Sequence, residues 1–192
     1  MQNSPIIDNH GRTIEYVRLA VTDRSNLRCF YCMPEEGIQY LKRAKLLTFE
    51  EMLRLLRILA GLGVSKVRIT GGEPFLRKNL IAFLREMVQI PGIQQWNLTT
   101  NGVLPKHYLV DMLQLNVQSV NLSLDTLDRE RFLKITRRDE LEKVLDCLHV
   151  MVESGIQTKI NAVVMEGKNT QDILSMAELA RELPIEMRFI EE

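Results

Sequence analysis

The residues best suited to chemistry lie in one short stretch, residues 22–34, which reads Thr-Asp-Arg-Ser-Asn-Leu-Arg-Cys-Phe-Tyr-Cys-Met-Pro. It holds two of the three cysteines of the chain, Cys29 and Cys32, separated by two residues. Such a pair can form half of a zinc site, a redox-active disulfide or part of an iron–sulfur cluster. Ser25 stands four residues before Cys29, where a third sulfur would complete an iron-cluster ligand set.

The zinc and disulfide interpretations draw on less of the sequence. A zinc site needs two more ligands of suitable type. The chain has three histidines: His10, His107 and His149. His149 and Cys147 flank a predicted amphipathic helix, where a structural role is favoured. A redox disulfide is typically followed directly by a helix, whereas Pro34 and Gly37 follow Cys32.

Strands and helices are expected to alternate along the chain and to position this stretch. Alternating or apolar patterns predict strands at residues 13–22, 66–70, 95–100, 119–124 and 157–165, and a sixth from residue 185. Helical spacing predicts helices at residues 48–61, 80–88, 105–115, 128–135, 139–154 and 171–183, the first with a capping box between Thr48 and Glu51. Such β-α units predict an α/β fold, a partial (β/α)6 parallel barrel of the TIM type that stops after the sixth strand. A doubly wound sheet is left open, because periodicity does not fix topology.

The predicted strands carry polar residues on one face, unlike the nearly continuous apolar runs typical of a covered parallel sheet. This polar face consists of Arg18, Ala20, Thr22, Arg68, Thr70, Asn97, Thr99, Asn121, Ser123, Asp125, Lys159, Asn161, Glu186 and Arg188. Any one of these could simply face solvent or pair with a neighbour. Their recurrence on six strands favours a polar barrel interior that holds a polar ligand or ordered water, with the site at the carboxyl ends of the strands.

Composition limits the other classes of function. Lysine plus arginine and aspartate plus glutamate both number 25, so no overall field favours DNA, RNA or membrane binding. The sequence shows neither a secretion signal nor an apolar run of roughly 20 residues, and we expect a cytoplasmic protein. A chain of 192 residues is expected to form one domain over residues 1–192.

The cysteine stretch resembles the Cys-x3-Cys-x2-Cys loop of the radical S-adenosylmethionine superfamily, with Ser25 in the place of the first cysteine. The turn Gly71-Gly72-Glu73-Pro74 resembles that superfamily's adenosylmethionine-binding turn. More narrowly, the order of motifs over essentially the whole chain is similar to the GTP 3′,8-cyclase family of molybdenum cofactor biosynthesis. The motifs that carry this narrower resemblance are Leu98-Thr99-Thr100-Asn101-Gly102, Asn121-Leu122-Ser123-Leu124-Asp125 and Arg188-Phe189-Ile190-Glu191.

The resemblance implies a 4Fe-4S cluster held by three thiolates, whose fourth iron binds S-adenosylmethionine. It implies that a 5′-deoxyadenosyl radical takes hydrogen from the ribose C3′ of GTP, after which the substrate closes onto C8 of the guanine. Cys29 and Cys32 would be cluster ligands, and GTP and a reductant protein would be the partners, with a homodimer left open. The implied adenosylmethionine contacts are Tyr31, Gly72 and Ser123, and the implied GTP contacts are Arg18, Arg68, Thr99 and Lys159.

Two features depart from the family pattern. A serine hydroxyl is far harder to deprotonate than a thiol, so Ser25 predicts a lost or weakened cluster. Family members also continue to a C-terminal segment with three more cysteines for a second cluster, and we expect that region to be absent here, since the sequence stops at Glu192. Three hypotheses remain: the N-terminal barrel of an impaired GTP 3′,8-cyclase, a noncatalytic nucleotide-binding remnant of that fold, and a radical enzyme with another substrate.

Overall fold

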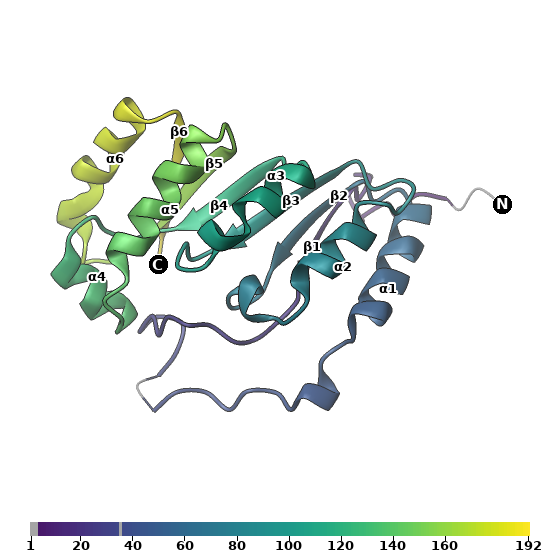
Figure 1. The fold of residues 1–192 in the computed structure, drawn as a ribbon, viewed down its shortest axis with the longest axis horizontal. Helices are drawn as coiled ribbons and strands as arrows, with labels where there is room; N and C mark the ends of the chain where they lie inside the picture. Colours follow the sequence, from purple (N-terminus) through teal and green to yellow (C-terminus); the bar gives the residue numbers. More distant parts are fainter. Residues whose placement is uncertain (1–3, 35) are drawn as a thin grey trace.

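The computed structural model describes residues 4–34 and 36–192, over which six strands alternate with helices (Figure 1). The strands are β1 (Tyr16–Ala20), β2 (Lys66–Thr70), β3 (Gln95–Thr100), β4 (Ser119–Ser123), β5 (Gln157–Val164) and β6 (Ile185–Glu191). The helices are α1 (Phe49–Gly61), α2 (Leu80–Met87), α3 (Leu109–Gln114), α4 (Arg129–Thr136), α5 (Leu141–Glu153) and α6 (Ile173–Glu182).

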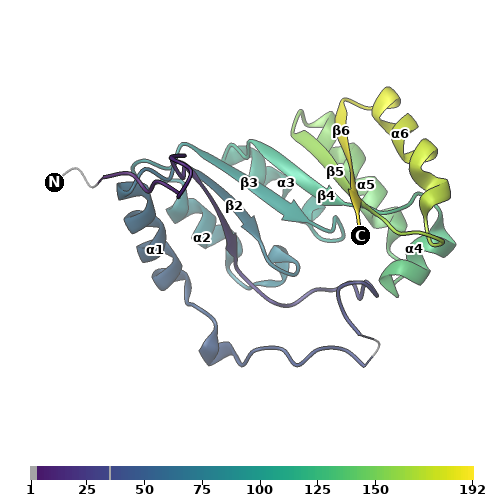
Figure 2. The same cartoon turned by 180° about the vertical axis from the view of Figure 1, so that it is seen from behind.

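All neighbouring strands pair in parallel, in the order β1-β2-β3-β4-β5-β6. A doubly wound sheet would reverse its strand order at a switch point, so this sequential order excludes that alternative. The helices cover one face of the sheet, as the two opposite views show (Figures 1 and 2). The predicted partial barrel is therefore confirmed.

Local sequence signals account for the elements. The predicted capping box at the start of α1 is present, with the Glu51 amide donating to Thr48 Oγ1 at 3.2 Å and the Thr48 amide donating to Glu51 Oε2 at 2.7 Å. β1 is shorter than the predicted strand at residues 13–22, since Thr13 bridges to Ile7 instead. The helices predicted at residues 105–115 and 171–183 each begin with a 3-10 turn, Pro105–Tyr108 and Thr170–Asp172, as helix N-termini often do.

The two faces of the sheet differ in the way that the alternation predicts. Val67, Leu98 and Ile160 are fully buried in one core with residues from the helices. The polar residues lie on the other face, where the strand register aligns them in three rows. These rows are Arg18, Arg68 and Asn97; Thr99, Asn121, Lys159 and Glu186; and Ser123, Asn161 and Arg188.

The chain between β1 and α1 makes a long excursion across the carboxyl ends of the strands and back (Figures 1 and 2). Arg77, just after β2, holds the two ends of this excursion together. Its guanidinium donates to the carbonyl oxygens of Val21 and Leu47, both at 2.5 Å, and lies 4.2 Å from the centroid of the Phe49 ring. Arg77 therefore fixes where the cysteine-bearing segment leaves and rejoins the barrel.

Candidate functional site

The cysteine loop, residues 22–34, is docked on the C-terminal end of α4. The amides of Arg28 and Phe30 donate to the carbonyl oxygens of Thr136 at 2.8 Å and Ile135 at 3.0 Å, two acceptors in the last turn of the helix, where carbonyl oxygens lack a partner within the helix. Arg137 donates to the carbonyl oxygens of Arg28 at 3.4 Å and Met33 at 3.1 Å. Because those two residues flank the Cys29–Cys32 pair, Arg137 holds both sides of the cysteine turn.

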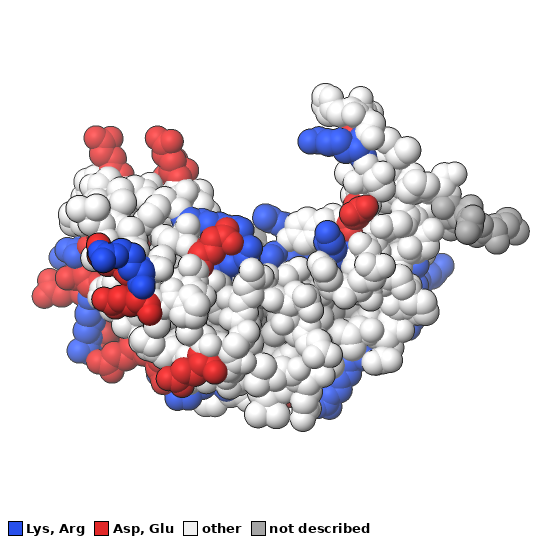
Figure 3. Space-filling view, turned by 90° about the horizontal axis from the view of Figure 1, so that it is seen from above, with Lys and Arg blue, Asp and Glu red and all other residues white. Residues whose placement is uncertain are grey.

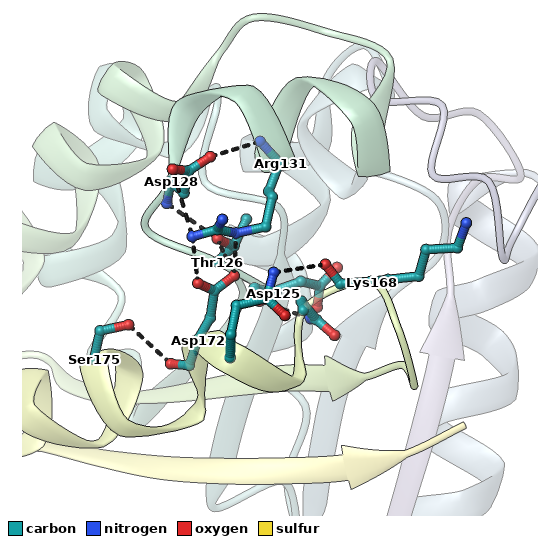
Figure 4. Close-up of polar contacts among 9 residues, drawn as sticks. Asp125, Thr126, Asp128, Arg131, Lys168, Asp172 and Ser175 are labelled. Atoms are coloured by element: carbon teal, nitrogen blue, oxygen red, sulfur yellow. Dashed lines mark hydrogen bonds and ion pairs between the residues drawn. The ribbon is translucent and has the colours of Figure 1, made fainter.

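The helix that carries this loop is itself anchored by a polar network (Figure 4). Arg131 of α4 binds Asp172 through two contacts, Nε to Oδ2 at 2.7 Å and Nη2 to Oδ1 at 2.6 Å. Thr126 Oγ1 donates to the same carboxylate at 2.7 Å, and the Asp128 carboxylate caps α4 by accepting from the Arg131 amide at 2.8 Å. The bidentate geometry fixes α4 against the segment before α6.

Tyr31 links the cysteine loop to the end of β4. Its hydroxyl donates to Asp125 Oδ2 at 2.8 Å, and the other carboxylate oxygen of Asp125 accepts from the Val163 amide at 2.9 Å. Burial raises the pKa of Asp125, and these two hydrogen bonds oppose that rise. Asp125 thus positions the tyrosine beside the two cysteines.

The glycine turn after β2 contacts the backbone of the cysteine loop directly. The amides of Gly72 and Glu73 donate to the carbonyl oxygens of Thr22 at 2.8 Å and Arg24 at 2.7 Å. A Cβ on Gly72 would lie 2.1 Å from the Arg24 oxygen, and one on Gly71, whose φ is +147°, would lie 2.4 Å from the Thr22 oxygen. Only glycine permits this approach, so Gly72 has a structural role in addition to the adenosylmethionine contact that the resemblance implies.

Glu73 is fully buried beneath this turn. Its carboxylate accepts from Thr100 Oγ1 at 2.9 and 3.0 Å and from the Asn101 amide at 2.9 Å, at the end of β3. Asn101 in turn donates through Nδ2 to Asn26 of the cysteine loop at 2.7 Å. Burial raises the pKa of Glu73 to about 7, against the effect of these hydrogen bonds. The network joins β2, β3 and the cysteine loop.

These contacts enclose a cavity of about 380 Å³ between the cysteine loop and the carboxyl ends of β2, β3 and β4. Seven of the ten candidate site residues, Ser25 included, line it: Ser25, Cys29, Tyr31, Cys32, Gly72, Thr99 and Ser123. The remaining three, Arg18, Arg68 and Lys159, lie outside its lining, on the polar face. The structure therefore gathers the residues assigned to the cluster and to adenosylmethionine in one place, together with Thr99.

The basic residues of the polar face lie on the face of the sheet opposite the helices. Figure 3 shows a hollow in the surface with lysine and arginine side chains along its floor. Arg68 is 9% exposed and donates to the Tyr16 hydroxyl at 2.6 Å and the Leu98 carbonyl oxygen at 2.9 Å. Lys159 pairs with Glu186 at 2.8 Å, so the simpler explanation of mutual pairing holds for this lysine.

The donor set at the cysteine loop does not match three thiolates. Ser25, which stands where the first cysteine of the motif would supply the third thiolate, instead accepts a hydrogen bond through Oγ from the Leu27 amide at 3.2 Å. Burial and the nearby Asp125 carboxylate raise the pKa of Cys29 to about 11, and the same two causes raise the pKa of Cys32. Within residues 4–34 and 36–192, no three histidine, cysteine or acidic side chains are grouped to hold a metal ion. The residues present therefore do not fit a cluster bound through three sulfurs.

Sequence reasoning missed several residues that shape this site. Arg137 acts through contacts that join segments far apart in the chain, and no local pattern marks it. Asn26 and Asn101 lie within stretches quoted from the sequence, but no role was predicted for either side chain, because their contact joins segments 75 residues apart. Asp125 stood out as a member of the polar face and of the motif at residues 121–125, but without a partner assigned to it. Its pairing with Tyr31 spans 94 residues of sequence.

The fold, a partial barrel with a cysteine loop and a glycine turn at the carboxyl ends of its strands, defines the structural class of this protein. The chain belongs to the radical SAM superfamily, whose family model matches residues 19–180. This superfamily is associated with a 4Fe-4S cluster and S-adenosylmethionine.

Two curated relatives narrow the comparison. The chain is 44% identical over 187 residues to "GTP 3',8-cyclase" of Geobacter sulfurreducens, covering 97% of this chain and 57% of the relative. It is 42% identical over 190 residues to "Molybdenum cofactor biosynthesis protein 1" of Drosophila melanogaster, covering 99% of this chain and 34% of the relative. The chain thus spans about a third to somewhat more than half of the length of these proteins.

Solved structures support the fold. SuiB of Streptococcus suis matches with a TM-score of 0.76 at 20% identity, over 93% of this chain and 40% of that one. A methylornithine synthase matches with a TM-score of 0.73 at 16% identity, over 94% of this chain and 54% of that one. No helix in the described part of the chain is long and apolar enough to span a membrane.

Proposed function

We propose that this chain forms the S-adenosylmethionine- and GTP-binding barrel of a GTP 3′,8-cyclase. The reaction would convert GTP to 3′,8-cyclo-7,8-dihydro-GTP in the first step of molybdenum cofactor biosynthesis. The observation that carries this proposal is the adjacency of two features: the cavity beneath the cysteine loop and the basic polar face that continues from it. A cosubstrate and a triphosphate substrate need two such neighbouring regions.

S-adenosylmethionine would occupy the cavity of about 380 Å³. Tyr31, Gly72 and Ser123 would contact it, one from the cysteine loop and two from the ends of β2 and β4. Apolar side chains of Leu27, Met33 and Phe132 also line the cavity and would pack against the adenosine part. A mostly apolar pocket with a few polar groups is typical of small-molecule sites.

GTP would lie over the polar face, with its phosphates near Arg18, Arg68 and Lys159 and with Thr99 at the boundary with the cavity. Several fixed cations are suited to a triphosphate, which carries multiple negative charges. Lys159 would exchange its partner Glu186 for phosphate oxygens. Arg68 is already oriented by Tyr16 and the Leu98 carbonyl oxygen, so binding costs it little side-chain entropy.

We further propose that Ser25 impairs this chain, because only two thiols are available for the cluster. The test is anaerobic reconstitution with iron and sulfide of the natural chain and of Ser25→Cys, followed by iron analysis and electron paramagnetic resonance. The natural chain is expected to retain clearly less iron than Ser25→Cys. Equal cluster content and equal spectra in the two proteins would contradict the impairment.

The same pair of proteins tests the function by calorimetry with S-adenosylmethionine and GTP. Both proteins are expected to bind GTP, and the Ser25→Cys variant to bind S-adenosylmethionine more tightly after reconstitution. Absence of GTP binding in both would overturn the assignment of the polar face. A reconstituted Ser25→Cys protein that converts a different substrate would favour another radical enzyme.

A second candidate function is supported by the donor set itself. Two thiols and one hydroxyl in an otherwise complete cavity fit a noncatalytic nucleotide-binding barrel. In that case the natural chain would bind GTP, would not cleave S-adenosylmethionine, and would keep the same GTP affinity after reconstitution.

A further inference from the structure

Two side-chain amides on the polar face have buried oxygen atoms to which no contact is assigned among the described residues. The Oδ1 atoms of Asn121 on β4 and Asn161 on β5 are buried, and within the described residues neither has a hydrogen-bond partner. Asn121 is only 5% exposed. Buried polar groups in native proteins nearly always have a hydrogen-bond partner. Two amide oxygens without one on adjacent strands indicate that a bound molecule on the polar face supplies the missing donors.

The register places these amides between the two proposed ligand regions. Asn121 has Thr99 and Lys159 as its neighbours on β3 and β5, and Asn161 has Ser123 as its neighbour on β4. Thr99 and Ser123 line the cavity, whereas neither asparagine does. Because neighbouring strands lie about 4.8 Å apart, each asparagine lies next to a residue that lines the cavity, and Asn121 also lies next to Lys159.

The chemistry of the amides narrows the group that they can receive. An amide oxygen accepts and an amide nitrogen donates, and the two ends of an asparagine can exchange places by rotation. A hydroxyl group both donates and accepts, so it satisfies either orientation. On a nucleoside triphosphate whose phosphates lie near Lys159, the nearest groups of this kind are the ribose hydroxyls.

We propose that Asn121 and Asn161 form a ribose-recognition site that binds the 2′- and 3′-hydroxyls of the nucleoside triphosphate. The proposal rests on the proposed function, because it takes GTP as the occupant of the polar face. The pair fixes the sugar next to the cavity, while Arg18, Arg68 and Lys159 hold the phosphates. It makes the site selective for ribonucleotides over deoxyribonucleotides.

The test is calorimetry of the full chain with GTP, 2′-deoxy-GTP, 3′-deoxy-GTP and inosine triphosphate. The natural chain is expected to bind GTP about tenfold more tightly than at least one deoxy analogue, since a lost hydrogen bond leaves a buried amide unpaired. Asn121→Leu and Asn161→Leu, which keep the side-chain shape without the amide, are expected to weaken GTP binding and to abolish its advantage over that analogue.

Asn97→Leu is the matched control, because Asn97 lies on the same face but its Oδ1 already accepts from Ser119 Oγ at 2.6 Å. This control is expected to keep the full difference between GTP and the deoxy analogue. Circular dichroism of each variant checks that it is folded. S-adenosylmethionine is titrated in parallel, and its affinity is expected to be the same in the natural chain and the two leucine variants.

The outcomes separate this inference from the function on which it rests. If GTP does not bind the natural chain, the proposed function fails and the ribose site with it. If GTP binds but the deoxy analogues bind equally well, only the ribose site is overturned. If the leucine variants lost only the difference in affinity between GTP and inosine triphosphate, the amides would contact the base. If they lost affinity for S-adenosylmethionine, the amides would contact the cosubstrate. Either result overturns the proposal.

Discussion

Glu73 makes the stability of this protein depend on pH in an unusual direction. The side chain is fully buried, and its pKa is raised from an ordinary value of 4.5 to about 7. Desolvation is the largest cause, and the hydrogen bonds from Asn101, Thr100 and Phe75 only partly offset it. A carboxyl group with a raised pKa binds its proton more tightly in the folded state than in the unfolded state.

The sign and size of the effect follow from this difference. Below pH 4.5 the group is protonated in both states, and its full contribution to stability is present. As the pH rises toward 7, the unfolded chain loses its proton first, and the free energy of unfolding falls. The difference between 4.5 and about 7, at about 1.4 kcal/mol for each pH unit, corresponds to a loss of about 3 kcal/mol by neutral pH.

The measurement is urea unfolding of the natural chain and of Glu73→Gln across this pH range. Glutamine has no proton to lose, so the stability of the variant relative to the natural chain should increase by about 3 kcal/mol from acid to neutral pH. Glu86→Gln, at an exposed site, serves as the control and should follow the natural chain. A stability difference between Glu73→Gln and the natural chain that stays constant with pH would refute the reasoning.

Three further predictions concern the site and its supports. Gly72→Ala should release the cysteine loop, since the new Cβ would lie 2.1 Å from the Arg24 oxygen, and faster hydrogen exchange in residues 22–34 would show it; unchanged exchange would contradict the contact. Asn121→Leu should raise the free energy of unfolding by about 1 kcal/mol in the absence of nucleotide, because a buried unpaired amide is costly. If urea titrations gave the variant a lower free energy of unfolding than the unsubstituted chain, the amide would have to be paired. Asp172→Ala should lower the midpoint of thermal unfolding, because it removes both contacts to Arg131, whereas Asp146→Ala, which breaks the exposed pair with Lys106, should leave it unchanged.

Much of the fold could be predicted because its signals are local. The spacing of apolar residues, the capping box at Thr48 and Glu51, and the turn at Gly71 and Gly72 all act within a few residues. The strand alternation also separated the two faces of the sheet correctly, since side chains of a strand point to opposite sides in turn. The order of the strands lay beyond such signals, because periodicity carries no information on which strands are neighbours.

The sequence by itself determined the chemistry available at this site: two thiols in the cysteine loop, one serine in the place of a third, and a polar face with several cations. Only the tertiary structure decided how these groups are used. It brought Tyr31 to Asp125 and Arg137 to the two sides of the cysteine turn. It also buried Asn121 Oδ1 where no other described residue donates a hydrogen bond to it. The physical reason is that such contacts depend on the curvature of the sheet and the path of the long loop, which arise from the packing of the whole chain and leave no local pattern.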